Sequence, residues 1–188
     1  MSKTYRIIVA THKRFQMPED KDLYIPIQVG SEGKEDLGYQ PDNQGVHISH
    51  LNPYYCELTG LYWAWKNLEC DYLGLVHYRR YFTSKRHSYR EAISMDDIIL
   101  SKSEVKNLLS KYDVVVPKKR KYYIETLYSH YAHTHDANHL DVTRQIVSEL
   151  RPDYIEAFDQ VMKQRSGYMF NMFIMSKENV AAYCEWLF

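Results

Sequence analysis

The chain has 188 residues, which is long enough for one domain with a sizeable apolar core. Its 24 Lys and Arg residues balance its 24 Asp and Glu residues, so no net charge draws it to nucleic acid or to an anionic membrane surface. No apolar run approaches the roughly 18 residues that a transmembrane helix requires, and the polar N-terminus does not resemble a secretory signal. The three cysteines, Cys56, Cys70 and Cys184, have no metal-ligand spacing and indicate reduced thiols in a cytoplasmic protein.

The first predicted element is an apolar, β-branched strand over residues 5–10, which leads through Thr11 into His12, Lys13 and Arg14. Residues 15–47 lack periodicity and are rich in Gly, Pro, Asp and Gln, apart from one predicted strand near residue 24. Long loops of this kind are often functional.

A helix that leads directly into a core strand is predicted next. Apolar residues recur at steps of three and four from Leu51 to Leu68, with Asn52 as a suitable N-cap and Pro53 at the first helical position. The apolar run at 72–76 then predicts a strand buried on both faces. The residues that follow it are His77, Tyr78, Arg79 and Arg80. A core strand that ends in two arginines indicates an anionic ligand.

The second half of the chain continues the alternation of helices and strands. Its predicted elements are a helix that opens at Ser101 or Ser103 and runs through Leu109, a strand at 113–116 followed by basic residues 118–121, a mainly helical stretch at 125–150, a helix at 153–162, a strand at 168–175 and a helix capped by Ser176. This last helix stops at an uncapped Trp-Leu-Phe. We therefore expect a single domain, 1–188, that is truncated at its C-terminus.

Alternating strands and helices predict an α/β fold with a mostly parallel sheet. In such sheets, ligands bind beyond the carboxyl ends of the strands. Three predicted strands carry basic residues at that end: 12–14, 77–80 and 118–121. If these clusters converge on one edge, the simplest ligand is a phosphate or diphosphate, which arginine grips with its planar fork of donors. The alternative is that these are ordinary polar loops.

Several familiar catalytic motifs are missing from the sequence. Neither glycine-rich phosphate loop is present, and no serine lies in a G-x-S-x-G elbow. His135 and His139 lie four residues apart with Asp136 between them, as a zinc or iron site could require, but the H-E-x-x-H order is absent. A metal-dependent hydrolase on the histidines at 130–141 and solvated helix histidines both stay open.

A general base for an acceptor hydroxyl must be positioned by its neighbours and accessible. The sequence offers four candidate carboxylates and does not choose among them: Asp42, Glu57, Asp136 and Asp141.

Three segments together carry a family resemblance: NPYYCELT at 52–59, YWAWKN at 62–67 and GLVHYRRYF at 74–82. They strongly resemble a bacterial family first catalogued as a domain of unknown function. Its members are found in capsular polysaccharide, exopolysaccharide and O-antigen biosynthesis and are regarded as glycosyltransferases. FNMFIM at 170–175 and YCEWLF at 183–188 are similar to its later motifs. The segment 126–141, with Tyr131, His135 and Asp141, is similar to its middle one.

The resemblance implies a GT-A-like fold and a nucleotide-sugar donor, with UDP-galactofuranose as the leading candidate. It also implies a growing cell-surface polysaccharide or a lipid-linked glycan as the acceptor. GT-A enzymes ordinarily hold the donor diphosphate through a divalent metal bound by an Asp-x-Asp motif. Here the corresponding strand ends in His-Tyr-Arg-Arg. We therefore expect metal-independent transfer without a cofactor, and a divalent metal is the less favoured alternative.

The resemblance also implies roles for individual residues. Donor binding falls to Thr11, His12, Lys13, His77, Tyr78, Arg79 and Arg80. The catalytic residues expected are Glu57 or Asp141 as the base, with Arg79 and Arg80 at the departing diphosphate. His135 and Asn171 are expected to contact the acceptor or the sugar.

Two further expectations concern the setting of the protein. We expect a cytoplasmic location, with peripheral association at the inner face of the plasma membrane as a further possibility. The alternative function is a non-catalytic module that binds nucleotides or phosphoglycans inside a polysaccharide assembly complex.

Overall fold

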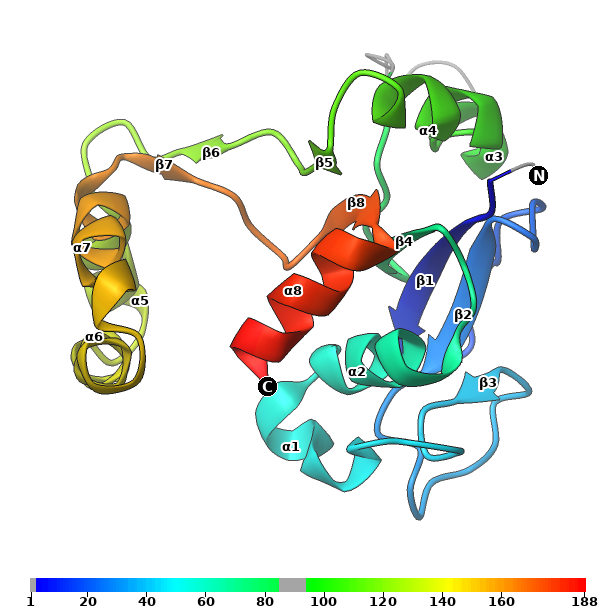
Figure 1. Ribbon diagram of the computed structural model, residues 1–188, viewed down its shortest axis with the longest axis horizontal. Coiled ribbons are helices and arrows are strands. Elements are labelled where there is room, and N and C mark those ends of the chain that lie inside the picture. The colour runs from blue at the N-terminus through cyan, green and yellow to red at the C-terminus, as the bar shows by residue number, and fades with distance from the viewer. Residues whose placement is uncertain (1–2, 85–93) are drawn as a thin grey trace. The chain divides into compact units, whose positions relative to one another are not determined.

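The structure is a computed structural model that describes residues 3–84 and 94–188, and its chain forms two compact units (Figure 1). The first, here called the sheet unit, comprises Met1–Val116 and Asn171–Phe188. The second, here called the helical unit, comprises Pro117–Phe170. The expectation of one domain over the whole chain stays a prediction.

Among its described residues, the sheet unit is built on six strands in the spatial order β3-β2-β1-β4-β8-β5. The first four strands of this order run parallel to their neighbours, whereas β8 is antiparallel to both β4 and β5. The strand bounds are Tyr5–Thr11 (β1), Tyr24–Gln28 (β2), Gln40–Pro41 (β3), Tyr72–His77 (β4), Val114–Val115 (β5) and Phe173–Ser176 (β8). The predicted α/β fold with a mostly parallel sheet is confirmed.

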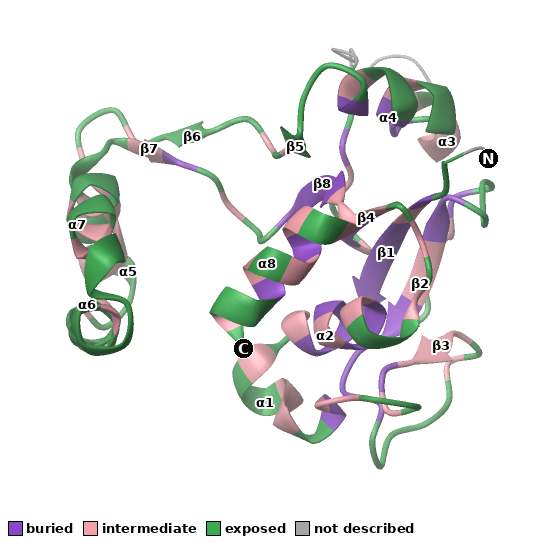
Figure 2. Ribbon diagram, viewed as in Figure 1, coloured by how far each residue is buried: buried purple, intermediate pink, exposed green. Residues whose placement is uncertain are grey.

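Helices cover both faces of the sheet. Because side chains of β1 point alternately to opposite sides, they pack in two apolar clusters, one on each face. Ile7 and Val9 pack in one apolar cluster with Val105 of α4, and Ile8 and Ala10 pack in another with α2 and α8. Figure 2 shows the buried residues along β1 and β8. The helices are η1 (Ser49–Leu51), α1 (Asn52–Tyr55), α2 (Leu58–Asn67), α3 (Met95–Ile98), α4 (Lys102–Leu109) and α8 (Lys177–Leu187).

Two predicted helix starts are confirmed by side-chain caps. Ser101 and Glu104 form a capping box at the start of α4, in which each side chain bonds the other residue's backbone N–H. The Ser176 hydroxyl accepts a hydrogen bond from the backbone N–H of Asn179 at the start of α8.

The prediction of a single helix over residues 52–68 is wrong, since the segment forms two helices. The chain breaks at Cys56, whose φ of 49° lies in the left-handed region, and α2 begins two residues later. Apolar residues on either side of the break keep helical spacing, so periodicity alone does not reveal it. The break gives Glu57 a position at a turn, ahead of α2.

The strand predicted over 168–175 is shorter in the structure, where β8 covers Phe173–Ser176. Phe170 and Asn171 have φ values of 75° and 53°, which a strand cannot accommodate. The sheet unit therefore resumes, after the helical unit, with a left-handed turn that leads into β8.

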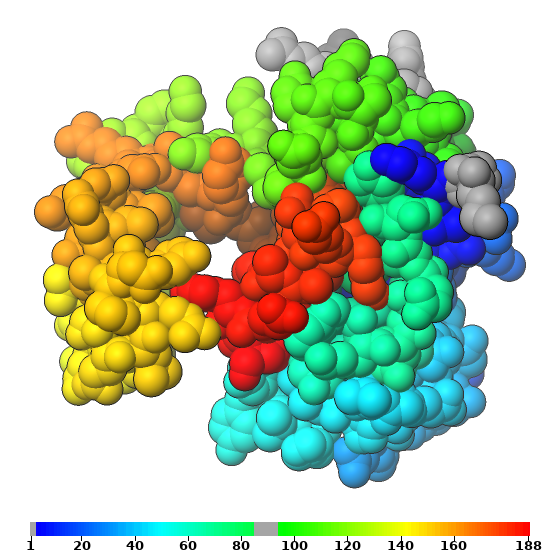
Figure 3. Space-filling model, in the orientation of Figure 1, coloured from blue at the N-terminus to red at the C-terminus, as the bar shows by residue number. Residues whose placement is uncertain are grey.

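The end of α8 packs beside α2 (Figure 3). The ring of Phe188 meets the ring of Tyr62 edge to face at a centroid distance of 5.1 Å and lies parallel to Trp65 at 6.5 Å. At the other end of α8, the Lys177 ammonium donates to the carbonyls of Ala64 and Leu68, at 3.0 and 2.8 Å. Burial lowers the pKa of Lys177. The last turn of α2 is thus satisfied by a side chain of α8.

The helical unit contains three α-helices and a short strand pair. Its elements are β6 (Arg120–Lys121), α5 (Leu127–Thr134), α6 (Asn138–Leu150), η2 (Pro152–Tyr154), α7 (Ile155–Lys163) and β7 (Ser166–Gly167). Arg144 of α6 binds both carboxylate oxygens of Asp159 in α7, each at 2.7 Å. In the part of the chain that the structure describes, no helix combines the length and apolar character needed to cross a bilayer.

Candidate functional site: a cationic cleft at the strand ends

The carboxyl ends of β1 and β4 lie side by side. The two strands are parallel neighbours, with Ala10 opposite His77, and the Tyr78 N–H donates to the Ala10 carbonyl at 3.2 Å. A tight turn follows β4, in which the backbone N–H groups of His77 and Arg80 each donate to the other residue's carbonyl, at 3.2 and 2.9 Å. This turn places Tyr78 and Arg79 at the tip of a strand that is anchored in the core.

The strand ends form one wall of a cleft of about 560 Å³. Its lining residues are Ala10, Thr11, His12, Val29, Lys34, Asn52, Cys56, Glu57, His77, Tyr78, Arg79 and Arg80. The lining therefore includes three permanent cations, two histidines and one carboxylate. Because the whole chain has no net charge, this local excess of positive charge suits a ligand with at least two negative charges.

The Tyr78 ring organises basic side chains at the mouth of the cleft. His12 meets it edge to face at a centroid distance of 5.3 Å. The Lys13 ammonium lies 5.3 Å from the ring centroid, and the Arg79 guanidinium carbon lies 5.0 Å from it. Cation–π attraction holds both cations near the ring while leaving their N–H donors available. No carboxylate of residues 3–84 or 94–188 is recorded within salt-bridge distance of Arg79.

Glu57 is held by two polar residues from separate parts of the sheet unit. Asn171 Nδ2 donates to Glu57 Oε1 at 2.9 Å, and His77 Nε2 lies 4.0 Å from the same oxygen. The side chains of Glu57 and His77 retain about a fifth of their exposure. Left-handed residues stand at both Cys56 and Asn171, and such strained backbone clusters at functional sites. The arrangement leaves a positioned, solvent-accessible carboxylate in a cationic cleft.

Asp42 is not available as a base, which corrects one of the four sequence candidates. Its carboxylate is fully buried and accepts five hydrogen bonds, from the Gly30 and Ser31 N–H groups and from the hydroxyls of Ser31, Ser49 and Thr59. Burial alone would raise the pKa of Asp42, but these hydrogen bonds outweigh it and hold the pKa below its ordinary value. Asp42 is therefore an internal anchor for the loops behind the cleft.

Two predicted site residues lie in the helical unit. Asp141 accepts a hydrogen bond from the Tyr128 hydroxyl at 3.0 Å and lines a cavity of about 340 Å³. His135 stacks on Tyr131 at a centroid distance of 4.6 Å and lines a groove of about 530 Å³. The roles predicted for both residues stay predictions.

The helix histidines mostly make pairwise contacts. His130 and His133 each hydrogen-bond one oxygen of Glu125, and His139 bonds the Tyr131 hydroxyl at 3.1 Å. Within residues 3–84 and 94–188, one group of three His, Cys, Asp or Glu residues has ligand atoms within 4.8 Å of one another. That group lies in the sheet unit and not on these helices.

Residues 6–188 match a family described as a domain of unknown function (DUF4422). The chain belongs to this family. Among solved structures, it is similar to the apo structure of WbbM, a bifunctional glycosyltransferase, with a TM-score of 0.83 and 30% sequence identity. The likeness covers 98% of this chain and 36% of WbbM, so the chain spans about a third of that protein's length. The search of curated proteins gave no match.

In this member of the DUF4422 family, two of the three predicted basic clusters come together. The side chains at 77–80 and His12 line the cleft, and Lys13 contacts Tyr78. The third cluster, 118–121, belongs to the helical unit, where Lys119 lies over Tyr168 and Arg120 over Tyr122. The order of elements in the sequence does not reveal that this cluster lies outside the sheet unit. After β5 the chain leaves the sheet and enters the helical unit.

Five lining residues are not among the predicted site residues: Ala10, Val29, Lys34, Asn52 and Cys56. The sequence identifies Asn52 only as an N-cap, yet its Nδ2 donates to the Cys56 carbonyl at 2.7 Å and braces the broken helix. Gly30 makes this possible, because a Cβ there would lie 2.3 Å from Asn52 Cγ and its φ is +58°. Cys56 forms the break itself, and Lys34 reaches the cleft from a loop that has no periodic signal.

Proposed function

We propose that this chain is a glycosyltransferase domain that moves a sugar from a nucleotide-diphosphate donor to a glycan acceptor. The observation that carries the proposal is the cationic cleft at the ends of β1 and β4, where the described lining sets Lys34, Arg79 and Arg80 against one carboxylate, Glu57. Likeness to WbbM, a glycosyltransferase, supports the reaction class. In open α/β sheets, this edge is where ligands bind.

The donor diphosphate would bind at the turn after β4. Arg79 and Arg80 present guanidinium groups that suit phosphate oxygens, and Lys34 adds an ammonium from the neighbouring loop. The nucleoside would lie toward Thr11, His12 and Lys13 at the end of β1. UDP-galactofuranose is the donor we favour, on the basis of the family resemblance.

We propose that no divalent metal is needed at the diphosphate. Mg²⁺ and Mn²⁺ prefer oxygen ligands, and the described lining offers one carboxylate, which is already hydrogen-bonded to Asn171. Fixed guanidiniums can neutralise the charge that develops on the leaving diphosphate. We therefore propose transfer in which arginine side chains stabilise the leaving group.

Glu57 is the base we favour for an inverting reaction. The acceptor hydroxyl oxygen would attack the anomeric carbon and form the new glycosidic bond. The bond from that carbon to the diphosphate oxygen would break, with its electron pair leaving on the diphosphate, and the hydroxyl proton would pass to Glu57. Asn171 and His77 would orient the carboxylate from the side of Oε1. Asp141 stays the alternative base.

The acceptor would be a cell-surface polysaccharide or a lipid-linked glycan. The groove of about 530 Å³ in the helical unit offers the aromatic rings of Tyr122, Tyr131 and Tyr168, with Arg120 and His135 among its polar groups. Flat rings beside hydrogen-bonding groups suit sugar faces. We propose this groove as a contact surface for the acceptor chain.

Titration calorimetry with UDP, with and without EDTA, tests the donor site. We expect binding that survives the chelator and falls by roughly tenfold to a hundredfold in Arg79→Ala, since a hydrogen bond to a charged group contributes about 1.5–3 kcal/mol. Arg120→Ala is the matched control, because Arg120 also lies over a tyrosine ring, at 5.3 Å, but in the helical unit. Loss of UDP binding on chelation would overturn the metal-free version.

Hydrolysis and transfer assays then separate an enzyme from a binding module. Release of UDP from UDP-galactofuranose in the presence of a glycan acceptor supports the transferase. UDP binding without any turnover of nucleotide sugars would favour the non-catalytic module.

A further inference from the structure

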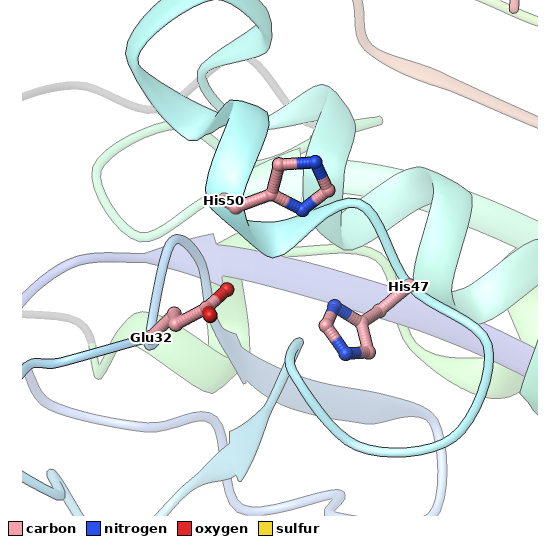
Figure 4. A group of neighbouring side chains, drawn as sticks. All are labelled: Glu32, His47 and His50. Atoms are coloured by element: carbon pink, nitrogen blue, oxygen red, sulfur yellow. The ribbon is translucent and has the colours of Figure 1, made fainter.

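A group of three side chains of the types that ligate metals lies outside the lining of the cleft. The ligand atoms of Glu32, His47 and His50 all lie within 4.8 Å of one another, and Figure 4 shows the three side chains around a common space. Glu32 belongs to the loop after β2, whereas His47 and His50 belong to the segment that leads into α1. The three residues are thus brought together by the fold, since Glu32 and His47 are separated by 14 intervening residues.

We propose that Glu32, His47 and His50 bind a transition-metal ion, with Zn²⁺ as the best match. Two imidazoles and one carboxylate form a donor set that zinc uses, with a water as the fourth ligand. Tetrahedral zinc, with bonds of about 2.0–2.1 Å, needs ligand atoms about 3.3 Å apart. Glu32 and His50 are exposed, so small side-chain rotations can close the remaining distance.

One nitrogen of His47 makes only a long contact with the backbone. The backbone N–H of Ser49 donates to His47 Nδ1 at 3.3 Å. A metal ligand must be the unprotonated nitrogen of a neutral imidazole. Since 3.3 Å is long for a hydrogen bond, replacing this contact by a metal bond would cost little.

The buried Asp42 network holds the backbone on both sides of the metal site. The Ser31 hydroxyl and the Ser49 hydroxyl both donate to Asp42 Oδ1, at 3.0 and 2.5 Å. Ser31 precedes Glu32 and Ser49 precedes His50, so one carboxylate fixes the chain next to two of the three ligands. Such preorganisation lowers the entropy that metal binding must overcome.

A bound metal would connect the two loops that form one side of the cleft. The loop that carries Glu32 also supplies Val29 and Lys34 to the lining, and the segment that carries His50 continues to Asn52. The metal would therefore stiffen this wall without touching the diphosphate. This inference is independent of the proposed reaction, because zinc binding is measured without nucleotide.

Zinc titration of the tag-free protein, by competition with a chromophoric chelator, tests the site. We expect one zinc per chain and a rise in Tm on adding zinc. Glu32→Gln, His47→Gln and His50→Gln should each weaken binding by more than about tenfold, since loss of an outer partner alone typically costs 10–100-fold. The control is the double variant His130→Gln/His133→Gln, which removes two histidines that share a carboxylate in the helical unit and should bind zinc as the wild type does.

Three results would overturn the proposal. They are the absence of zinc binding at micromolar concentrations, equal binding by the triple variant of Glu32, His47 and His50, and loss of binding in the control variant. Circular dichroism without metal checks that each variant folds. If the triple variant loses zinc binding but still binds UDP, zinc binding and donor binding are independent of each other.

Discussion

In the sheet unit, side chains of β1 alternate between two buried apolar clusters, whereas Gly167 is the one buried residue among residues 117–170 of the helical unit. In the helical unit, apolar side chains such as those of Leu127, Leu140 and Phe158 are only half-buried, and the bidentate pair of Arg144 and Asp159 lies at the surface. The two units therefore differ in how firmly they can position a functional group.

This difference matches the chemistry that we assign to each unit. A leaving group needs charges that are already in place, and the arginines after β4 extend from a strand in the core. A glycan chain has many similar faces, and a groove formed by half-exposed rings on helices can adjust to them. Changes in the sheet unit should thus have large, specific effects, and changes in the helical unit smaller ones.

The largest effect is expected at Glu57. Glu57→Gln keeps the hydrogen bond from Asn171 possible but removes the proton acceptor, so sugar transfer should slow by about 10²–10⁴-fold with UDP affinity little changed. Asp141→Asn is the matched substitution in the helical unit. Steady-state kinetics on both variants makes the comparison, and equal losses at the two positions, or a larger loss at Asp141, would contradict the choice of Glu57.

The next largest effect concerns the stability of the sheet unit. Asp42→Ala leaves five buried donors without their acceptor and should lower the free energy of unfolding by about 3–5 kcal/mol. Urea denaturation followed by circular dichroism measures this change. A loss below about 1 kcal/mol would mean that the network contributes little to stability.

The same residue predicts how stability depends on pH. Because the pKa of Asp42 in the folded protein lies below its unfolded value of about 3.9, its contribution is complete above that value and is lost as the pH falls through the folded pKa. Asp42→Asn lacks this titration. The difference in unfolding free energy between wild type and Asp42→Asn should therefore shrink as acid is added, and a difference that widens would refute the assignment.

The smallest effect is expected for Asp159→Ala in the helical unit. The Arg144–Asp159 pair is at the surface, where solvent screens its charges and exposed ion pairs contribute little. The pKa of Asp159 is lowered mainly by its hydrogen bonds from Arg144, so any loss of stability on mutation should disappear at acid pH. Thermal melts at neutral pH should show a change far smaller than that of Asp42→Ala.

Local patterns predicted the parts of the fold and site that depend on neighbours in sequence. The strands before His12 and His77, the parallel sheet and the caps at Ser101 and Ser176 follow from apolar runs and hydrogen-bonding side chains at fixed offsets. Parallel pairing then brought two basic strand ends together, as expected. These features needed no information about distant contacts.

The missed features all depend on contacts between distant residues or on backbone geometry. The left-handed φ at Cys56 leaves no mark in the apolar spacing around it. Asp42 was a candidate base because nothing near it in sequence indicates burial by Ser31 and Thr59. Lys34 and the triad around His47 likewise reach their positions through a loop whose sequence carries no periodicity.

The helix α2 is fastened to the same neighbouring segment at both of its ends. Asn171, just before β8, bonds Glu57 ahead of the first turn, and Lys177, at the start of α8, bonds the carbonyls of the last turn. Ten residues of helix span about 15 Å. A substitution at Lys177 would therefore loosen the C-terminal end of α2. Because the helix is rigid, the change would shift the position of the Glu57 carboxylate in the cleft.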